Sequence, residues 1–135
     1  MIGIIGAMDE EVAMLKEKLT KVQVETKAAM DFYKGKLEGK DVVVVRSGIG
    51  KVNAAMCAQI LADVYHADHV INTGIAGSLK AEINIGDIVL STDALQHDMD
   101  AQAFGYEPGQ IPRVDTLSFK ADENMISLAK ECCKR

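Results

Sequence analysis

The chain has 135 residues, of which 48% are apolar and 26% charged, proportions typical of one soluble globular domain. A chain of this length can bury a single core without disulfides or a structural metal. Its net charge of −5 and the lack of any Lys/Arg cluster in the sequence argue against nucleic acid as a partner. A small neutral or cationic ligand fits this charge better.

Several sequence features bear on the cellular compartment. The apolar runs are strand-sized, far below the roughly 18 residues of a membrane span, so we expect no membrane partner. The first residues carry no basic group and are followed at once by Asp9, unlike a signal peptide. Cys57, Cys132 and Cys133 form no C-x-x-C pair, which indicates reduced thiols and neither a disulfide framework nor a zinc site. We therefore expect a cytoplasmic protein.

The first half of the chain alternates strand and helix patterns. Residues 2–5 form an apolar run ended by Gly6, and residues 9–19 show apolar side chains at helical spacing. Further strands are predicted at residues 22–26, 32–37 (with Met30-Asp31 between these two) and 42–45.

A second helix is predicted at residues 52–66. This stretch is rich in alanine and has Met56, Ile60 and Val64 four residues apart, which predicts that these three side chains face the core. A strand around Val70 follows and enters a glycine turn.

The remaining segments are a strand, a long loop and a last helix. They are predicted at residues 88–91, 97–112 and 122–134, respectively. Strands that alternate with helices predict a layered α/β fold with a largely parallel sheet.

Three glycine turns follow predicted strands, at residues 3–6, 48–50 and 74–77. In a parallel α/β sheet the ligand crevice lies at such strand ends. None of the turns matches a dinucleotide or P-loop motif, because Asn53 replaces the third glycine of G-x-G-x-x-G. Plain tight turns therefore remain an alternative to a ligand site.

Two polar clusters could carry chemistry. Asp9, Glu10 and Glu11 open the first helix, where acidic residues compensate the positive helix end; alternatively, one of them is a general base acting on water. The segment from His97 to Asp100 could form half of a metal site, but its ligands come from one short stretch, so we favour a hydrogen-bonded polar loop and expect no metal.

Aromatic residues and prolines gather in the long loop. Phe104 and Tyr106 lie close to Pro108 and Pro112, and together they suggest a pocket wall or a subunit interface.

Five runs, in order, resemble the 5'-methylthioadenosine/S-adenosylhomocysteine nucleosidase family of the purine nucleoside phosphorylase-like superfamily. They are residues 2–11 (IGIIGAMDEE), 47–55 (SGIGKVNAA), 72–77 (NTGIAG), 86–89 (GDIV) and 97–106 (HDMDAQAFGY). The resemblance implies a three-layer α/β/α fold with a central mixed, largely parallel sheet. It also implies hydrolysis of the N-glycosidic bond of methylthioadenosine and S-adenosylhomocysteine to release adenine, without a cofactor.

The resemblance also implies roles for individual residues. Glu11 corresponds to the carboxylate that activates the attacking water, with Met8 and Ile49 near the ribose. The Ile75, Ala76 and Gly77 turn lies beside the purine and ribose. Phe104 and Pro112 match positions that reach across a homodimer interface to the 5'-alkylthio group, so a homodimer that binds an adenine thionucleoside is expected.

Two departures from the family pattern qualify this expectation. Ile75 stands where many relatives have a small hydroxyl residue, which disfavours phosphate and tilts the chemistry toward hydrolysis. Residues 1–135 resemble only the N-terminal portion of one nucleosidase domain, and the family's general acid falls in the second half. We therefore expect an apparently truncated fold with unpaired strand edges and exposed apolar surface, and an inactive chain. A purine nucleoside phosphorylase and a non-catalytic fragment that binds an adenine nucleoside or serves in dimerisation remain alternatives.

Overall fold

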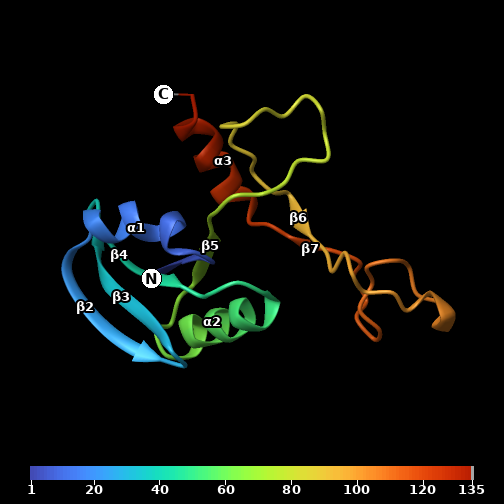
Figure 1. Ribbon diagram of the computed structural model, residues 1–135, viewed down its shortest axis with the longest axis horizontal. Helices are drawn as coiled ribbons and strands as arrows, with labels where there is room; N and C mark the ends of the chain where they lie inside the picture. The colour runs from blue at the N-terminus through green and yellow to red at the C-terminus, as the bar shows by residue number, and fades with distance from the viewer. Residues whose placement is uncertain (135) are drawn as a thin grey trace. The chain divides into compact units, whose positions relative to one another are not determined.

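The computed structural model describes residues 1–134 (Figure 1). The chain divides into two compact units, residues 1–79 and the described residues from 80 onward.

A five-stranded sheet forms the centre of the first unit. Its strands are β1 (Ile2–Gly6), β2 (Thr20–Lys27), β3 (Met30–Leu37), β4 (Lys40–Arg46) and β5 (His69–Asn72), in the order β2-β3-β4-β1-β5. β1 pairs in parallel with β4 and β5, whereas β2, β3 and β4 form an antiparallel meander. The sheet is therefore mixed, with its parallel part at β4-β1-β5.

Two helices cover opposite faces of this sheet, as Figure 1 shows for α1 (Asp9–Lys18) and α2 (Lys51–Asp63). Val12 of α1 packs in one apolar cluster with Ile4 and Val44. Leu61 of α2 packs in a second cluster, which contains Val43. Because Val43 and Val44 are successive strand residues, they point to opposite faces of the sheet. The predicted α/β/α layering is confirmed.

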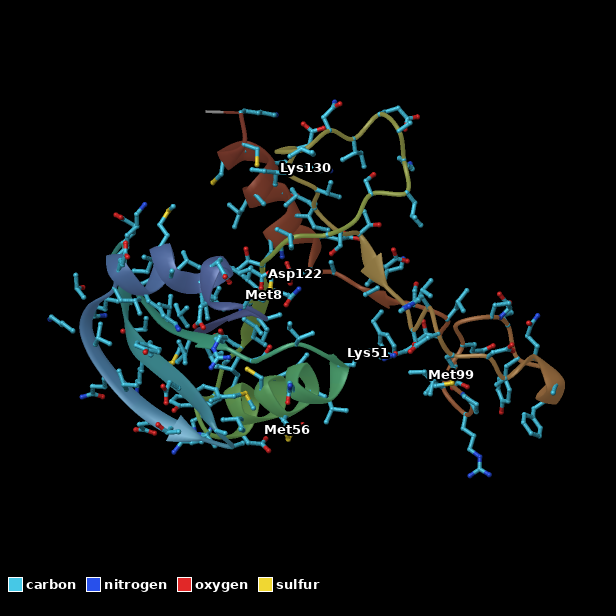
Figure 2. The ribbon with its side chains drawn as sticks, viewed as in Figure 1. Met8, Lys51, Met56, Met99, Asp122 and Lys130 are labelled. Carbon is cyan, nitrogen blue, oxygen red and sulfur yellow. The ribbon has the colours of Figure 1, made fainter. Side chains whose placement is uncertain are left out.

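The buried side of α2 differs from the prediction at Met56 and Val64, whereas Ile60 is partly buried against the second cluster. Met56 and Val64 are 42% and 48% exposed, and Figure 2 shows Met56 on the side of α2 away from the sheet. Instead Cys57 and Leu61 are fully buried. Gly3 of β1 makes this packing possible, since a Cβ at position 3 would lie 2.8 Å from Cδ1 of Leu61. The buried side of α2 therefore carries Cys57, Leu61 and Tyr65, and Leu61 packs into the space left by Gly3.

The hairpin turn between β2 and β3 also differs from the prediction. It falls at Ala28 and Ala29, both with positive φ (49° and 60°), and Met30 and Asp31 belong to β3. Two successive residues with positive φ match the right-handed twist of the flanking strands.

The second unit has little regular structure. It contains β6 (Asp93–Ala94) paired with β7 (Phe119–Lys120), a short 3-10 helix (Gln102–Phe104) and α3 (Glu123–Cys132), which Asp122 caps by accepting a hydrogen bond from the Met125 N–H. The predicted last helix is confirmed. Ser91 and the three residues before it form no strand, so that prediction was wrong. Ile88 and Val89 are 74% and 64% exposed, and a strand without a paired neighbour is not stable.

Two further findings concern the described part of the chain. Within residues 1–134, no cluster of three metal-ligating side chains occurs, and Asp100 instead accepts a hydrogen bond from the Gln102 N–H at 3.1 Å. None of the helices described there is long and apolar enough to cross a bilayer.

The first unit leaves apolar sheet surface open to solvent. β5 lies at one edge of the sheet, and its Val70 and Ile71 are 44% and 36% exposed. An exposed edge strand with apolar side chains is a ready template for pairing. This is the kind of surface that the sequence led us to expect.

Candidate active site

The glycine turns after β4 and β5 lie beside the end of β1 because β4, β1 and β5 are adjacent parallel strands. Residues 3–6, which were predicted as a third turn, belong to β1. Beyond the strand ends, the Ser47 N–H donates to the Gly6 carbonyl and the Thr73 N–H donates to the Ile5 carbonyl, both at 2.9 Å. These bonds hold the turns after β4 and β5 against the end of β1. The predicted gathering at the ends of neighbouring strands is thus confirmed for the turns at residues 48–50 and 74–77.

Glu11 extends from the first turn of α1 toward this edge. Its Oε2 accepts hydrogen bonds from the N–H groups of Ala7 (2.6 Å) and Met8 (2.9 Å), which caps the start of the helix. Its Oε1 accepts a third bond, at 3.0 Å, from the N–H of Ile75 in the turn after β5. A helix cap needs only the first two bonds, so the third bond gives Glu11 a role beyond the helix.

The two carboxylate oxygens of Glu11 differ in their remaining capacity. An ionised carboxylate offers about four lone-pair sites, two on each oxygen. Ala7 and Met8 fill both sites on Oε2, whereas Ile75 fills one on Oε1. Among the bonds of residues 1–134, Oε1 thus accepts one fewer than Oε2, which leaves it the capacity to accept from a water or a ligand hydroxyl.

These contacts keep Glu11 ionised. The Met8 N–H is the largest influence that lowers the pKa of Glu11, followed by the Ile75 N–H, while partial burial opposes them and the Ala7 N–H adds a smaller lowering effect. The carboxylate is charged at neutral pH, as an acceptor of a water proton must be.

The other two acidic residues at the start of α1 have different surroundings. Asp9 forms ion pairs with Arg46 at 3.2 Å and Lys16 at 3.8 Å. Glu10 is exposed beside Glu11. Of the two alternatives for this acidic cluster, Glu11 makes the contact with the helix end through Oε2, and its Oε1 also accepts a bond from outside the helix.

An open pocket of about 440 Å³ lies at this position, where β1 passes into α1 near Met8 (labelled in Figure 2). The lining residues come from two segments, the start of α1 and the turn after β5. They are Met8, Glu10, Glu11, Thr73, Gly74 and Ile75.

The structure brings together three of the predicted site residues, Met8, Glu11 and Ile75. Ile49, 74% exposed, and the exposed Ala76 and Gly77 lie in the neighbouring turns but do not line this pocket. Phe104 and Pro112 belong to the second unit, where both are exposed.

Sequence reasoning missed Thr73 and Gly74 as pocket residues. The Asn72-Thr73-Gly74 run was visible as a strand entering a turn, but which of its residues face Glu11 depends on the β1–β5 pairing.

The first unit is thus an α/β fold, a mixed sheet between two helices, with an anchored carboxylate in a pocket at the ends of its parallel strands, which is the usual place for small-molecule sites in such folds. The sequence profile of the phosphorylase superfamily matches residues 1–135, and the chain belongs to that superfamily.

Within this superfamily, the chain is similar to several nucleosidases. The chain is 49% identical over 131 residues to the 5'-methylthioadenosine/S-adenosylhomocysteine nucleosidase of Bacillus thuringiensis subsp. konkukian, covering 97% of this chain and 56% of that protein. The nucleosidase of Colwellia psychrerythraea, solved with adenine, is 48% identical with a TM-score of 0.93, covering 96% of this chain and 53% of that one. The Neisseria meningitidis nucleosidase, solved with methylthio-immucillin-A, is 39% identical with a TM-score of 0.95, covering 98% and 57%. The chain spans about half the length of the curated relatives it matches and resembles their N-terminal part.

Proposed function

We propose that residues 1–135 supply the water-binding side of a nucleosidase site that hydrolyses the N-glycosidic bond of methylthioadenosine and S-adenosylhomocysteine and releases adenine. The observation that carries the proposal is the Glu11 carboxylate, bonded to N–H groups at the ends of both β1 and β5 and open to the pocket. The relatives solved with adenine and with methylthio-immucillin-A support the choice of substrate.

In this reaction a water adds to the anomeric carbon of the ribose while the bond to the adenine nitrogen breaks, and the water's proton passes to Glu11. The remaining acceptor site on Oε1 suits such a water. A carboxylate with a lowered pKa is a weak base, which is sufficient where the transition state resembles an oxocarbenium ion. Glu10 adds negative charge near that cation.

Ile75 favours water over phosphate at this site. Its side chain is 83% exposed at the pocket and offers no hydroxyl donor, and the nearby carboxylates of Glu10 and Glu11 would repel an anion. Hydrolysis is therefore preferred to phosphorolysis, the alternative chemistry within the superfamily.

The remaining residue assignments are part of the same proposal. Met8 and Ile49 would contact the ribose, and Ala76 and Gly77 the purine and ribose. Phe104 and Pro112 would reach the 5'-alkylthio group of a partner subunit's substrate in a homodimer.

We further propose that the 135-residue chain does not catalyse this hydrolysis by itself. The pocket formed by the first unit holds Glu11 on the water side, while departure of adenine requires a general acid, whose loss typically costs 10²–10⁴-fold in rate. The chain covers 56% of the Bacillus relative, which is consistent with a site that needs further residues.

The test measures adenine release from methylthioadenosine by this chain and by a chimera in which the C-terminal part of the Bacillus relative follows residue 135. Each is made with Glu11→Gln and, as a matched control on the same helix, with Glu17→Gln, which is exposed and outside the pocket. We expect activity only in the chimera, about 10²–10⁴-fold lower with Glu11→Gln and unchanged with Glu17→Gln.

Three results would contradict the proposal. Turnover by the short chain would show that it needs no further groups. An unaffected Glu11→Gln chimera would remove Glu11 from the chemistry. Product formation that depends on phosphate would identify a phosphorylase instead.

A further inference from the structure

We propose that Gly74 is a positioning residue: its lack of a side chain lets the turn after β5 approach the Glu11 carboxylate, bring the Ile75 N–H onto Oε1 and leave the other site on Oε1 open. The catalytic meaning of this inference rests on the proposed function, but the placement of the carboxylate can be tested without turnover.

Gly74 lies directly against the carboxylate of Glu11. A Cβ at position 74 would overlap Oε1 of Glu11 and lie 2.7 Å from its Cδ and 3.1 Å from its Oε2. The three nearest atoms to that position all belong to this one carboxylate. Gly74 also has no positive φ, so its φ does not call for glycine. The observed position of the Glu11 carboxylate is therefore compatible only with a residue that has no Cβ at position 74.

The clash has a predictable resolution. Oε1 and Oε2 are the end of a flexible side chain, so an alanine at position 74 is accommodated by moving the carboxylate of Glu11 and not the backbone of β5. A displaced carboxylate loses the bond from the Ile75 N–H first, because that donor lies on the same turn as Gly74, whereas Ala7 and Met8 directly precede α1, on the same segment as Glu11. The sheet then remains intact while Glu11 loses its connection to β5.

Gly77 provides a matched control within the same turn. A Cβ at position 77 meets nothing within 4 Å, and Gly77 likewise has no positive φ. Gly77→Ala and Gly74→Ala therefore add the same methyl group three residues apart, and only the second meets Glu11.

The experiment is a titration of the Glu11 carboxyl by carbon NMR in chains labelled at the glutamate carboxyl, with the resonance assigned from its loss in Glu11→Gln. In the unsubstituted chain and in Gly77→Ala, we expect the Glu11 midpoint below the ordinary range and an Ile75 amide resonance that shifts with the same midpoint. In Gly74→Ala, we expect the Glu11 midpoint to move up toward the ordinary range and the Ile75 amide to lose its response. An unchanged midpoint and amide response in Gly74→Ala would overturn the inference.

A second comparison covers the case in which Gly74→Ala does not fold. With Glu11→Ala already in place, the added Gly74→Ala has no carboxylate to displace, so the double variant should match Glu11→Ala in urea unfolding. Failure of the double variant to fold would mean that the methyl group meets something other than Glu11, and the inference would be wrong. If Glu11→Gln did not lower adenine release by the chimera, in contrast, only the proposed function would be contradicted, and the placement of the Glu11 carboxylate by Gly74 would stand.

Discussion

Shortening Leu61 to alanine tests which side of α2 faces the sheet. Leu61 is fully buried in the cluster that contains Ile5 and Val43, so Leu61→Ala removes apolar contact and leaves a cavity beneath Gly3. Such changes cost 2–5 kcal/mol, and the complete burial of Leu61 places it near the middle, about 3 kcal/mol. That is a large share of a total stability of about 5–15 kcal/mol and corresponds to roughly a 10 °C fall in Tm.

Met56→Ala is the matched change on the other side of the helix. Because Met56 is 42% exposed, we expect it to cost about 1 kcal/mol. Urea and thermal unfolding followed by circular dichroism at 222 nm measure both values. If Met56→Ala lowered the free energy of unfolding as much as Leu61→Ala or more, the burial of Leu61 against the sheet would be refuted. The result would instead favour Met56 as the core-facing residue, as predicted from the sequence.

Gly3→Ala probes the same contact from the strand. The added Cβ would lie 2.8 Å from Leu61 Cδ1, and overpacking of this kind costs about 1–3 kcal/mol. In the Leu61→Ala background the methyl group enters the vacated space, so the cost should fall. Equal costs in the two backgrounds would mean that Gly3 and Leu61 are not in contact.

Other ionisable groups give further expected outcomes. Because folding lowers the pKa of Glu11, its contribution to stability is present above the unfolded pKa and is lost as the pH falls through the folded pKa. The difference in unfolding free energy between the unsubstituted chain and Glu11→Gln should therefore shrink on acidification. Urea unfolding from pH 7 downward would measure this difference. Burial raises the pKa of Cys57 to about 11, so about one in a thousand Cys57 thiols is ionised at pH 8. A thiol reagent should label the exposed Cys132 and Cys133 rapidly and Cys57 only on unfolding, as mass spectrometry of the labelled peptides would show. Burial and the Glu25 carboxylate raise the pKa of Tyr65 to about 12, so its phenol should stay mostly protonated at pH 11 in an ultraviolet titration; a Tyr65 that ionises at pH 10 would contradict its burial.

The strands of the first unit were predictable because dense apolar runs such as that of β4 have few alternatives to a buried sheet. The buried side of α2 was not, since its apolar side chains form two series at a spacing of four residues, one through Met56 and one through Leu61. The contacts that distinguish the two series are distant in the sequence: Leu61 packs against Gly3, 58 positions earlier, and Tyr65 stacks on Phe32. The apolar side chains of Ile88 and Val89 favour a strand, but their exposure shows that no partner strand buries them within the described residues.

In the candidate site, too, the features set by neighbouring residues were predictable from the sequence, whereas the contacts between distant segments were not. An acidic cluster before a helix is visible in the sequence, yet the three carboxylates are equivalent there, and the resemblance to a family, not the pattern, selects Glu11. The pairing of β5 with β1 places the Ile75 N–H against Oε1 of Glu11 across 64 positions. No local pattern contains that contact, nor the requirement for glycine at position 74.

The strand order has a consequence for how the first unit acquires its structure. β1 is made first, but its two neighbours are β4 and β5, whose registers pair Ile2 with Val42 and with His69. The meander from β2 to β4 joins sequence neighbours and can close early, since local contacts carry the smaller loop-closure cost. β1 must then pair with the free edge of β4. The hydrogen bond from the Ile75 N–H to Glu11 cannot form until β5 has paired with β1. In pulsed hydrogen exchange during refolding, the amides of β3 should thus become protected before those of β1, and Ile75 should be among the last.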